Sequence, residues 1–359
     1  MQTTSQMKSS LGKKSTPAVK GKRGAKLLSG SSNGDQQTGS RLPDGEHGLV
    51  VGVDIGGSNL RVALADLRGT VLGRWNTSTK TTSSPEMVTA QIEQGIGHLL
   101  RQSSSSHRSL LSIAAGAPGV TDPKTGVVLA TSYLKGWKDV PLRQLLESTL
   151  GVPAAIENDV RMAALGEHSR GVAQGVDDFV FLAIGTGIAA GVFANGKLIH
   201  GINSTAGEVG YMHVPGATEK PARPGEPGSL ESSIGGDGIR QQWSKACSDA
   251  SACNLTATEI FARASSGDAL AKSVLENSAQ LLAYTVYNIS VVLNSALFVL
   301  GGGIGVSIPL CDATRRILEA YSEPSRPQLV ISRLGPDAQL IGAIWLALTT
   351  AKQTSGNRV

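Results

Sequence analysis

Two junctions between an apolar segment and a polar turn carry the side chains best suited to chemistry in this sequence. In the first, an apolar run ends in Glu-Asn-Asp at residues 157–159, where a helical pattern begins. In the second, the apolar run Phe179–Ile184 ends in Gly-Thr-Gly at residues 185–187. A carboxylate with an ordinary pKa of about 4 is ionised at neutral pH and can accept a hydroxyl proton. A glycine turn can cradle phosphate oxygens with backbone N–H groups. Together the motifs predict phosphoryl transfer to a small alcohol.

We predict Asp159 as the general base of that reaction. Asn and Asp are also favoured N-cap residues of helices, so an ordinary helix cap is the competing interpretation. The two roles are compatible, because either Asn158 or Asp159 could cap the helix while the other contacts substrate.

A similar glycine turn follows the first apolar strand of the chain. Its polar and small residues are Asp54, Gly56, Gly57 and Ser58. Without Cβ atoms the glycines let a phosphate approach the backbone, and Asp54 could hold a metal-bound water. A plain glycine hairpin would explain this turn alone. A second glycine turn stands at the equivalent place of a repeated unit. This pairing favours the interpretation that the two turns together bind the phosphates of ATP. This second turn consists of Gly185, Thr186 and Gly187.

Two further loops have residues suited to binding. Glu208 lies between glycines in Ala-Gly-Glu-Val-Gly and could accept hydrogen bonds from sugar hydroxyls, although a solvated loop charge is an equal alternative. Three glycines at 301–303 follow an apolar strand and precede a helix, which suits close packing of Gly302 and Gly303 against an adenosine. They do not match G-x-G-x-x-G, so a dinucleotide site is a poor interpretation.

The periodicity of apolar residues predicts an α/β protein built from two copies of one unit. Strands are expected at 49–54, 60–66 and 71–77, and again at 179–184, 188–194 and 197–199. After each set, helices alternate with strands, beginning with the helix 85–102. Such a duplication should leave a cleft between the two halves.

Composition limits the possible partners. The net charge is +5, and residues 1–46 hold all of that excess, so the remainder is neutral on balance. We expect 1–46 to be a disordered basic tail, with a nucleic-acid-binding arm as the minor alternative. The neutral body gives no electrostatic reason to bind nucleic acid.

Cysteine and histidine usage excludes several classes of protein. The three cysteines form no C-x-x-C pair, which fits a reducing cytoplasm better than a disulfide framework. The six histidines show no zinc-ligand spacing. No run of about 18 apolar residues occurs, so we expect no membrane span.

Taken in order, the motifs resemble those of the ROK family of sugar kinases and repressors, within the actin/hexokinase superfamily. The resemblance covers most of residues 48–351. Beyond the motifs above it includes Gly-Ala-Pro-Gly at 116–119, Tyr-Leu-Lys-Gly-Trp at 133–137 and Leu-Ile-Gly-Ala at 340–343.

The resemblance implies a duplicated actin-like ATPase (ribonuclease H-like) fold with two domains and a cleft between them. The implied lobes are 47–175, onto which a C-terminal helix 338–352 packs back, and 176–337. It also implies ATP and Mg²⁺ as cofactors, a sugar substrate and a homodimer. Asp159 would be the base, and the implied sugar contacts are Asn158, Gly119, Glu208, Tyr211 and Glu231.

The sequence departs from the family pattern at three places. Tyr211 stands where His is usual, and the following segment to Glu231 has no cysteines, so we expect no zinc. Tyr133 stands where Asn is usual, and these changes affect the choice of sugar. We predict glucose kinase activity that yields glucose 6-phosphate. The alternatives are fructose, mannose, allose or N-acetylmannosamine as substrate, or a non-catalytic sensor or transcriptional regulator.

Overall fold

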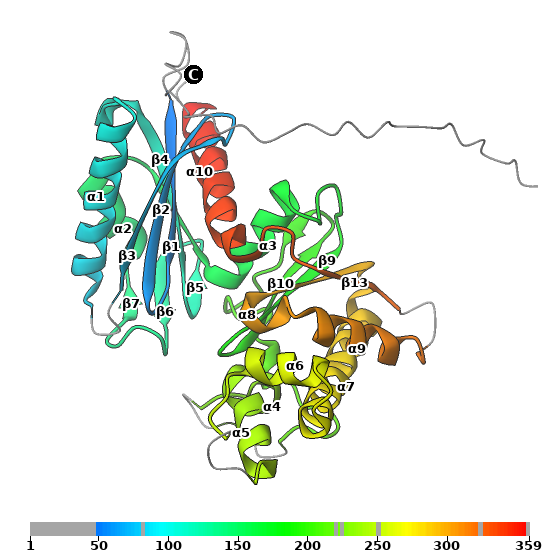
Figure 1. The fold of residues 1–359 in the computed structure, drawn as a ribbon. Coiled ribbons are helices and arrows are strands. Elements are labelled where there is room, and N and C mark those ends of the chain that lie inside the picture. The colour runs from blue at the N-terminus through cyan, green and yellow to red at the C-terminus, as the bar shows by residue number, and fades with distance from the viewer. Residues whose placement is uncertain are drawn as a thin grey trace, which may run out of the picture. The chain divides into compact units, whose positions relative to one another are not determined.

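The computed structural model describes residues 48–79, 83–218, 222, 226–248, 253–321 and 326–356. The predicted tail 1–46 and six residues of the segment that replaces the family's zinc knuckle, 219–221 and 223–225, lie outside these residues. Within them, two five-stranded mixed sheets form the framework (Figure 1). No helix among the described residues is long and apolar enough to span a bilayer.

The two sheets have the same topology, which confirms the predicted duplication. In each sheet, three antiparallel strands come first in the chain. Two later strands then add in parallel along the free edge of the first of these three strands. The first sheet has the order β3-β2-β1-β4-β8, with β1 Leu49–Ile55, β2 Asn59–Asp66, β3 Val71–Ser78, β4 Leu110–Ala117 and β8 Ala154–Asn158. The second has the order β11-β10-β9-β12-β13, with β9 Phe179–Ile184, β10 Ile188–Ala194, β11 Lys197–Leu198, β12 Leu297–Gly301 and β13 Gln328–Ile331.

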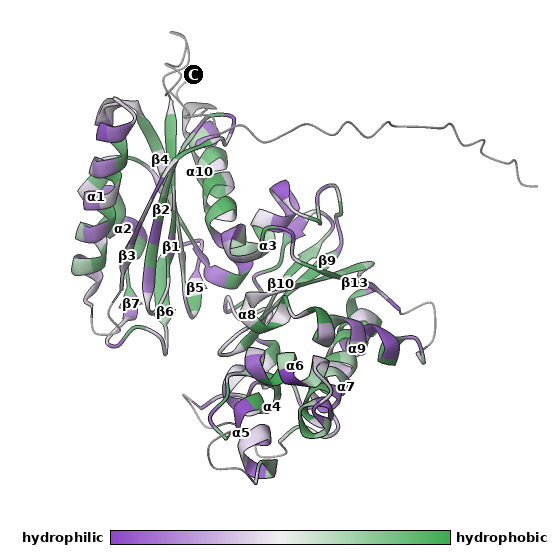
Figure 2. Ribbon diagram, viewed as in Figure 1, coloured by the Kyte–Doolittle hydropathy of each residue, from purple (hydrophilic) through white to green (hydrophobic). Residues whose placement is uncertain are grey.

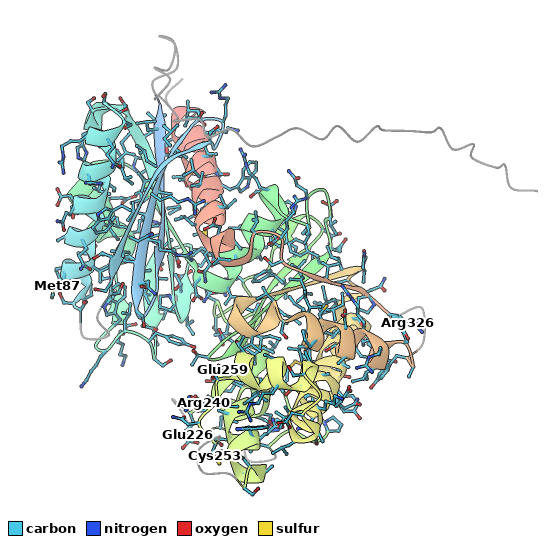
Figure 3. All side chains as sticks on the ribbon, viewed as in Figure 1. Met87, Glu226, Arg240, Cys253, Glu259 and Arg326 are labelled. Carbon is cyan, nitrogen blue, oxygen red and sulfur yellow. The ribbon has the colours of Figure 1, made fainter. Side chains whose placement is uncertain are left out.

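Helices cover both faces of the first sheet, and side chains alternate between these faces along each strand. Val51, Val53 and Ile55 face a core formed with α1 Pro85–Gln102 and α2 Leu142–Leu150. Val50 faces α10 Ala338–Gly356, and a Cβ at Gly52 would lie 2.8 Å from the Ile344 side chain on that helix. The central strand β1 is almost wholly apolar, whereas β2 and the outer strand β3 include hydrophilic residues (Figure 2), and the outer side of α1 exposes polar residues and Met87 (Figure 3).

The second sheet repeats this arrangement. Val180, Leu182 and Ile184 face a core built with the remaining helices, which include α5 Gly236–Ala246, α6 Ala257–Ser265, α7 Ala269–Leu293 and α9 Ile308–Leu318. Phe179 and Phe181 face α3 Asp159–Arg170 on the opposite side. Thus α10 covers one sheet, α3 covers the other, and these two helices pack against each other.

Several elements differ from the prediction. A three-stranded sheet was not expected; it comprises β5 Val120–Asp122, β6 Val127–Ala130 and β7 Lys138–Val140. The short helix α4 Glu231–Ile234 and α5 were also missed. The predicted loop 301–303 is wrong in part, because Gly302–Gly305 forms a single helical turn, α8.

Glycines allow the close crossing of α3 and α10. A Cβ at Gly166 would lie 2.0 Å from the carbonyl oxygen of Ala338, and one at Gly342 would lie 1.8 Å from that of Met162. Real Cβ atoms do not approach oxygen so closely, and backbone carbonyls inside helices cannot swing aside. The glycine of the Leu-Ile-Gly-Ala motif at 340–343 is therefore required by packing.

We expect Gly342→Ala to lower the free energy of unfolding by about 1–3 kcal/mol or more, because the added methyl forces the two helices apart. Urea unfolding followed by circular dichroism measures the change. Gly97→Ala in α1 is the control, since its Cβ would approach only a flexible arginine side chain at 3.4 Å, and alanine is the better helix former. Equal stability of Gly342→Ala and the wild type would contradict this packing argument.

Candidate active site

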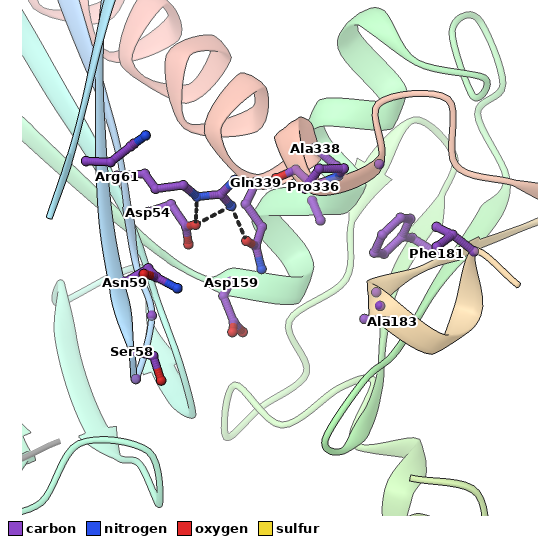
Figure 4. A pocket seen from close by; sticks show the side chains of 18 residues that line it. Asp54, Ser58, Asn59, Arg61, Asp159, Phe181, Ala183, Pro336, Ala338 and Gln339 are labelled. Carbon is purple, nitrogen blue, oxygen red and sulfur yellow. Dashed lines mark hydrogen bonds and ion pairs between the residues drawn. The ribbon is translucent and has the colours of Figure 1, made fainter. Parts of the chain in front are cut away.

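The corner where β8 becomes α3 positions the predicted base. Asn158 is the helix N-cap: its Oδ1 accepts from the backbone N–H groups of Val160 and Arg161, both at 3.0 Å. Its Nδ2 donates to the Gly119 carbonyl at 2.9 Å and to Asp159 Oδ1 at 3.0 Å. Capping thus falls to Asn158, and Asp159, the first helical residue, is left with its carboxylate directed into a cavity (Figure 4).

The environment of Asp159 changes its proton affinity. Burial raises its pKa to about 7, and the negative charges of Asp54 and Glu208 act in the same direction. The backbone N–H of Val160 and the charge of Arg161 oppose this rise. The expectation of an ordinary pKa near 4 is therefore wrong, because the carboxylate lies among other carboxylates with little water around it.

Asp159 lines a cavity of about 700 Å³ together with residues of both sheets. From the predicted nucleotide set this cavity gathers Asp54, Gly56, Gly57, Ser58, Gly302 and Gly303. The backbone at Gly303 is open to a ligand, since a Cβ there would meet no protein atom within 4 Å. Sequence reasoning missed several other residues of this cavity, namely Asn59, Arg61, Asn76, Phe181, Ala183, Pro336 and Gln339.

Asp54 forms an ion pair at the wall of this cavity. Arg61 donates from Nε to Asp54 Oδ2 at 2.7 Å and also contacts it through Nη2. The same guanidinium donates to the Pro336 carbonyl at 2.6 Å and to Gln339 Oε1 at 3.0 Å (Figure 4). Burial raises the pKa of Asp54, and Arg61 partly offsets that rise. Arg61 lies on β2, so this interaction connects the first sheet to the start of α10.

A second cavity of about 760 Å³ collects most of the predicted sugar contacts. It is lined by Gly119, Glu208, Tyr211 and Glu231, and also by Thr131, Tyr133, Thr186 and Gln241. Asn158 connects the two cavities through its side-chain amide. The amide Nδ2 donates a hydrogen bond to Gly119, which lines the second cavity, and another to Asp159, which lines the first. From the second glycine turn, Thr186 lines this second cavity. Gly187 packs closely against Glu231, because a Cβ on Gly187 would lie 2.4 Å from Glu231 Oε2.

Carboxylates dominate the electrostatics of the second cavity. Burial raises the pKa of both Glu208 and Glu231. The charge of Glu231 raises that of Glu208 further, and Arg161 lowers it. Glu231 Oε2 accepts from the Ile188 N–H at 3.2 Å. Carboxylates accept hydrogen bonds and repel anions, so this arrangement suits a neutral ligand rich in hydroxyl groups.

A buried ion pair behind the corner holds it in place, and sequence reasoning missed it. Arg161 Nε donates to Glu157 Oε1 at 2.7 Å, and the guanidinium also donates to the carbonyls of Thr121 and Ser204 at 3.0 Å. The other Glu157 oxygen lies 2.7 Å from His200 Nε2. These partners hold the pKa of Glu157 below its usual value despite burial. An arginine within a helix of buried alanines was the available signal.

We expect Arg161→Met to destabilise the fold by about 3–5 kcal/mol, because it leaves a buried carboxylate without its main partner. Guanidinium unfolding at pH 7 measures the loss, and Arg161→Met with Glu157→Gln should recover part of it. Arg316→Met, which breaks the exposed pair with Glu276, should cost less than about 1 kcal/mol. Similar losses for the two single variants would contradict a structural role for the buried pair.

The raised pKa of Asp159 predicts a pH-dependent gain in stability for Asp159→Asn. The folded carboxyl has a pKa of about 7 against the ordinary 3.8 of an aspartate in the unfolded chain, so the wild type loses stability as pH rises between these values. The asparagine variant avoids this loss. Its melting temperature relative to the wild type should increase from pH 4 to pH 7 and level off above. Asp312→Asn, at an exposed site, should have a small effect. A pH-independent difference for Asp159→Asn would contradict the pKa shift.

No group of three or more His, Cys, Asp or Glu side chains in the described part of the chain is arranged to hold a metal ion. Mg²⁺ in phosphoryl-transfer sites commonly uses only one or two carboxylates, with water and phosphate completing its shell. The acidic wall formed by Asp54 and Asp159 in the first cavity fits that requirement.

Comparison with known proteins places this chain in one family. The sequence profile of the ROK family matches residues 50–350. A glucokinase from Halalkalibacterium halodurans is 30% identical over 310 residues, which are 82% of this chain and 94% of that protein. An N-acetylmannosamine kinase from Salmonella typhi is 27% identical over 302 residues, covering 83% of this chain and 98% of that protein.

A solved structure agrees with the sequence comparison. The ROK hexokinase from Thermus thermophilus superposes with a TM-score of 0.70 at 28% identity, covering 86% of this chain and 99% of that one. The actin-like fold is therefore confirmed. Given the match over residues 50–350 and the shared fold, the chain belongs to the ROK family.

Proposed function

We propose that the chain is an ATP-dependent sugar kinase that phosphorylates a hexose hydroxyl, with glucose as the first candidate and glucose 6-phosphate as product. One observation carries this proposal. Asp159 lines the first cavity, and the Asn158 amide holds it beside Gly119 of the second. A base at the junction of two cavities suits transfer from a ligand in one to a hydroxyl in the other.

In this proposal the first cavity binds ATP and the second binds the sugar. The proposed nucleotide residues that line the first cavity are Asp54, Gly56, Gly57, Ser58, Gly302 and Gly303. The others are Gly185, Thr186 and Gly187 of the second glycine turn, which are not among the residues that line that cavity. The sugar residues are Asn158, Gly119, Glu208, Tyr211 and Glu231. The location of Thr186 in the second cavity suits a turn that meets the terminal phosphate where it faces the sugar.

Asp159 accepts the proton of the attacking hydroxyl. Its pKa of about 7 makes it most effective as a base near neutral pH. The transition state of phosphoryl transfer is loose, so the carboxylate acts first in orienting the hydroxyl and then in late proton removal. Backbone N–H groups of the glycine turns stabilise charge on the transferred group. Asp54 would help to hold Mg²⁺, which neutralises phosphate charge when it is bound.

Other features of the protein follow from the family relationship and remain predictions. We propose lobes of 47–175, with 338–352 returning to it, and 176–337, together with a homodimer, a cytoplasmic location and the absence of zinc. The relationship to an N-acetylmannosamine kinase as well as a glucokinase supports N-acetylmannosamine as the second candidate substrate.

The proposed reaction is tested by ADP release from ATP and Mg²⁺ with glucose, mannose, fructose, allose, N-acetylglucosamine and N-acetylmannosamine. We expect sugar-dependent ADP release, highest with glucose. No release above the sugar-free rate with any of them would overturn the proposed activity.

Asp159→Asn should lower kcat by about 10²–10⁴-fold, because the amide cannot accept the proton. The Kd for sugar should change little, since the amide keeps the Oδ1 that Val160 and Asn158 contact. Steady-state kinetics and calorimetric sugar titration measure the two effects. Asp312→Asn on the surface of α9 is the control and should retain wild-type kcat. Near wild-type turnover by Asp159→Asn would remove Asp159 as the base.

A further inference from the structure

Tyr133 occupies a position in the second cavity that the family relationship does not explain. It lies in the loop between β6 and β7, where its N–H donates to Thr131 Oγ1 at 3.1 Å. Its neighbours anchor that loop: Leu134 and Trp137 are buried, and the Trp137 indole donates to the Ser83 carbonyl at 2.9 Å. Tyr133 itself remains 41% exposed, so a firmly held loop presents a residue that can meet a ligand in the cavity.

The side chain of Tyr133 extends from one glycine turn to the other. At the first turn, a Cβ on Gly57 would lie 3.3 Å from the Tyr133 Cβ and carbonyl oxygen. At the second, a Cβ on Gly187 would lie 3.3 Å from the Tyr133 hydroxyl and 2.4 Å from Glu231 Oε2. The phenol oxygen and the Glu231 carboxylate therefore approach the same point above Gly187.

Burial and the charges around the phenol favour its neutral, hydrogen-bond-donating form even further than in water. Burial, followed by the negative charges of Glu231, Asp159 and Glu208, raises the pKa of Tyr133 to about 12. The cavity thus offers a neutral O–H donor among carboxylates that only accept.

A sugar hydroxyl placed between these two groups would donate to Glu231 and accept from Tyr133. An acetamido group at the same place can donate to Glu231 through its N–H, but its nitrogen cannot accept from the Tyr133 O–H, and its acetyl group adds bulk beside the phenol ring. A site with both groups therefore distinguishes a free hydroxyl from an N-acetyl substituent.

We propose that Tyr133 is the specificity-determining residue of this site and restricts it to hexoses that carry an unsubstituted hydroxyl opposite Glu231, against N-acetylhexosamines. This inference rests on the proposed sugar kinase function and adds its substrate class.

Two variants of Tyr133 test the inference, with kcat/KM measured for glucose, mannose and their N-acetylated counterparts. Tyr133→Phe keeps the ring and loses the donor, so kcat/KM for the preferred hexose should fall about 10- to 100-fold, while the N-acetylhexosamines stay poor substrates. Tyr133→Asn removes the ring, so the ratio of kcat/KM for N-acetylhexosamine over hexose should rise at least tenfold. Tyr321→Phe, at a ring that pairs with Tyr287 outside both cavities, is the control and should match the wild type.

Calorimetric titration of the same sugars without ATP separates this inference from the proposed reaction. Binding of hexoses by a protein that releases no ADP would overturn the kinase proposal and still test Tyr133 through the Kd ratios. Equal use or binding of hexoses and N-acetylhexosamines by the wild type, or unchanged ratios in a folded Tyr133→Asn, would overturn the role of Tyr133 and leave the kinase proposal standing. Failure to bind or phosphorylate any sugar would overturn both.

Discussion

The side-chain amide of Asn158 makes the hydrogen bonds on which the site depends. Its oxygen caps α3 through the N–H groups of Val160 and Arg161, and its nitrogen holds Gly119 and Asp159. A helix start leaves N–H groups without partners inside the helix, and Asn satisfies them well. The same amide thereby sets the end of β8, the direction of α3 and the position of the carboxylate. The same hydrogen bonds of Asn158 therefore stabilise the start of the helix and fix the geometry of the site.

The duplicated architecture places that corner between two similar sheets. Each sheet buries one face under a helix, α10 for the first and α3 for the second, and these helices cross at Gly166 and Gly342. Because the backbones touch there, small changes in that crossing would move residues at the start of α3 relative to the first sheet. Arg61 makes a second connection, since it joins Asp54 on β1 to Gln339 on α10. Packing between the halves and the shape of the first cavity are thus coupled.

Electrostatic cost is concentrated where the proposed chemistry takes place. Asp159, Glu208 and Glu231 each have a raised pKa from burial, and Asp159 and Glu208 are raised further by neighbouring charge. Such a cluster opposes folding at neutral pH, and the positive charge of Arg161 directly behind it lowers the pKa of both Asp159 and Glu208. In the proposed mechanism a base with a pKa of about 7 is an advantage, because proton acceptance near neutral pH is most effective from such a group. Perturbed carboxylates of this kind are typical of active sites.

Local patterns in the amino-acid sequence were enough for most strands and helices, the duplication and the glycine turns, because the periodicity of apolar residues and turn chemistry act over a few neighbours. Helix α1 was predicted with its observed bounds, whereas the short strands β5–β7 were missed because three or four residues carry too little periodicity. The grouping of site residues into two cavities required the tertiary structure, since Gly119, Glu208 and Glu231 are far apart in the chain. The pKa of Asp159, the pairing of Asp54 with Arg61 and the reach of Tyr133 between two turns arise from burial and from distances across the fold. Such effects depend on which segments meet in space, and spacing along the chain does not encode them.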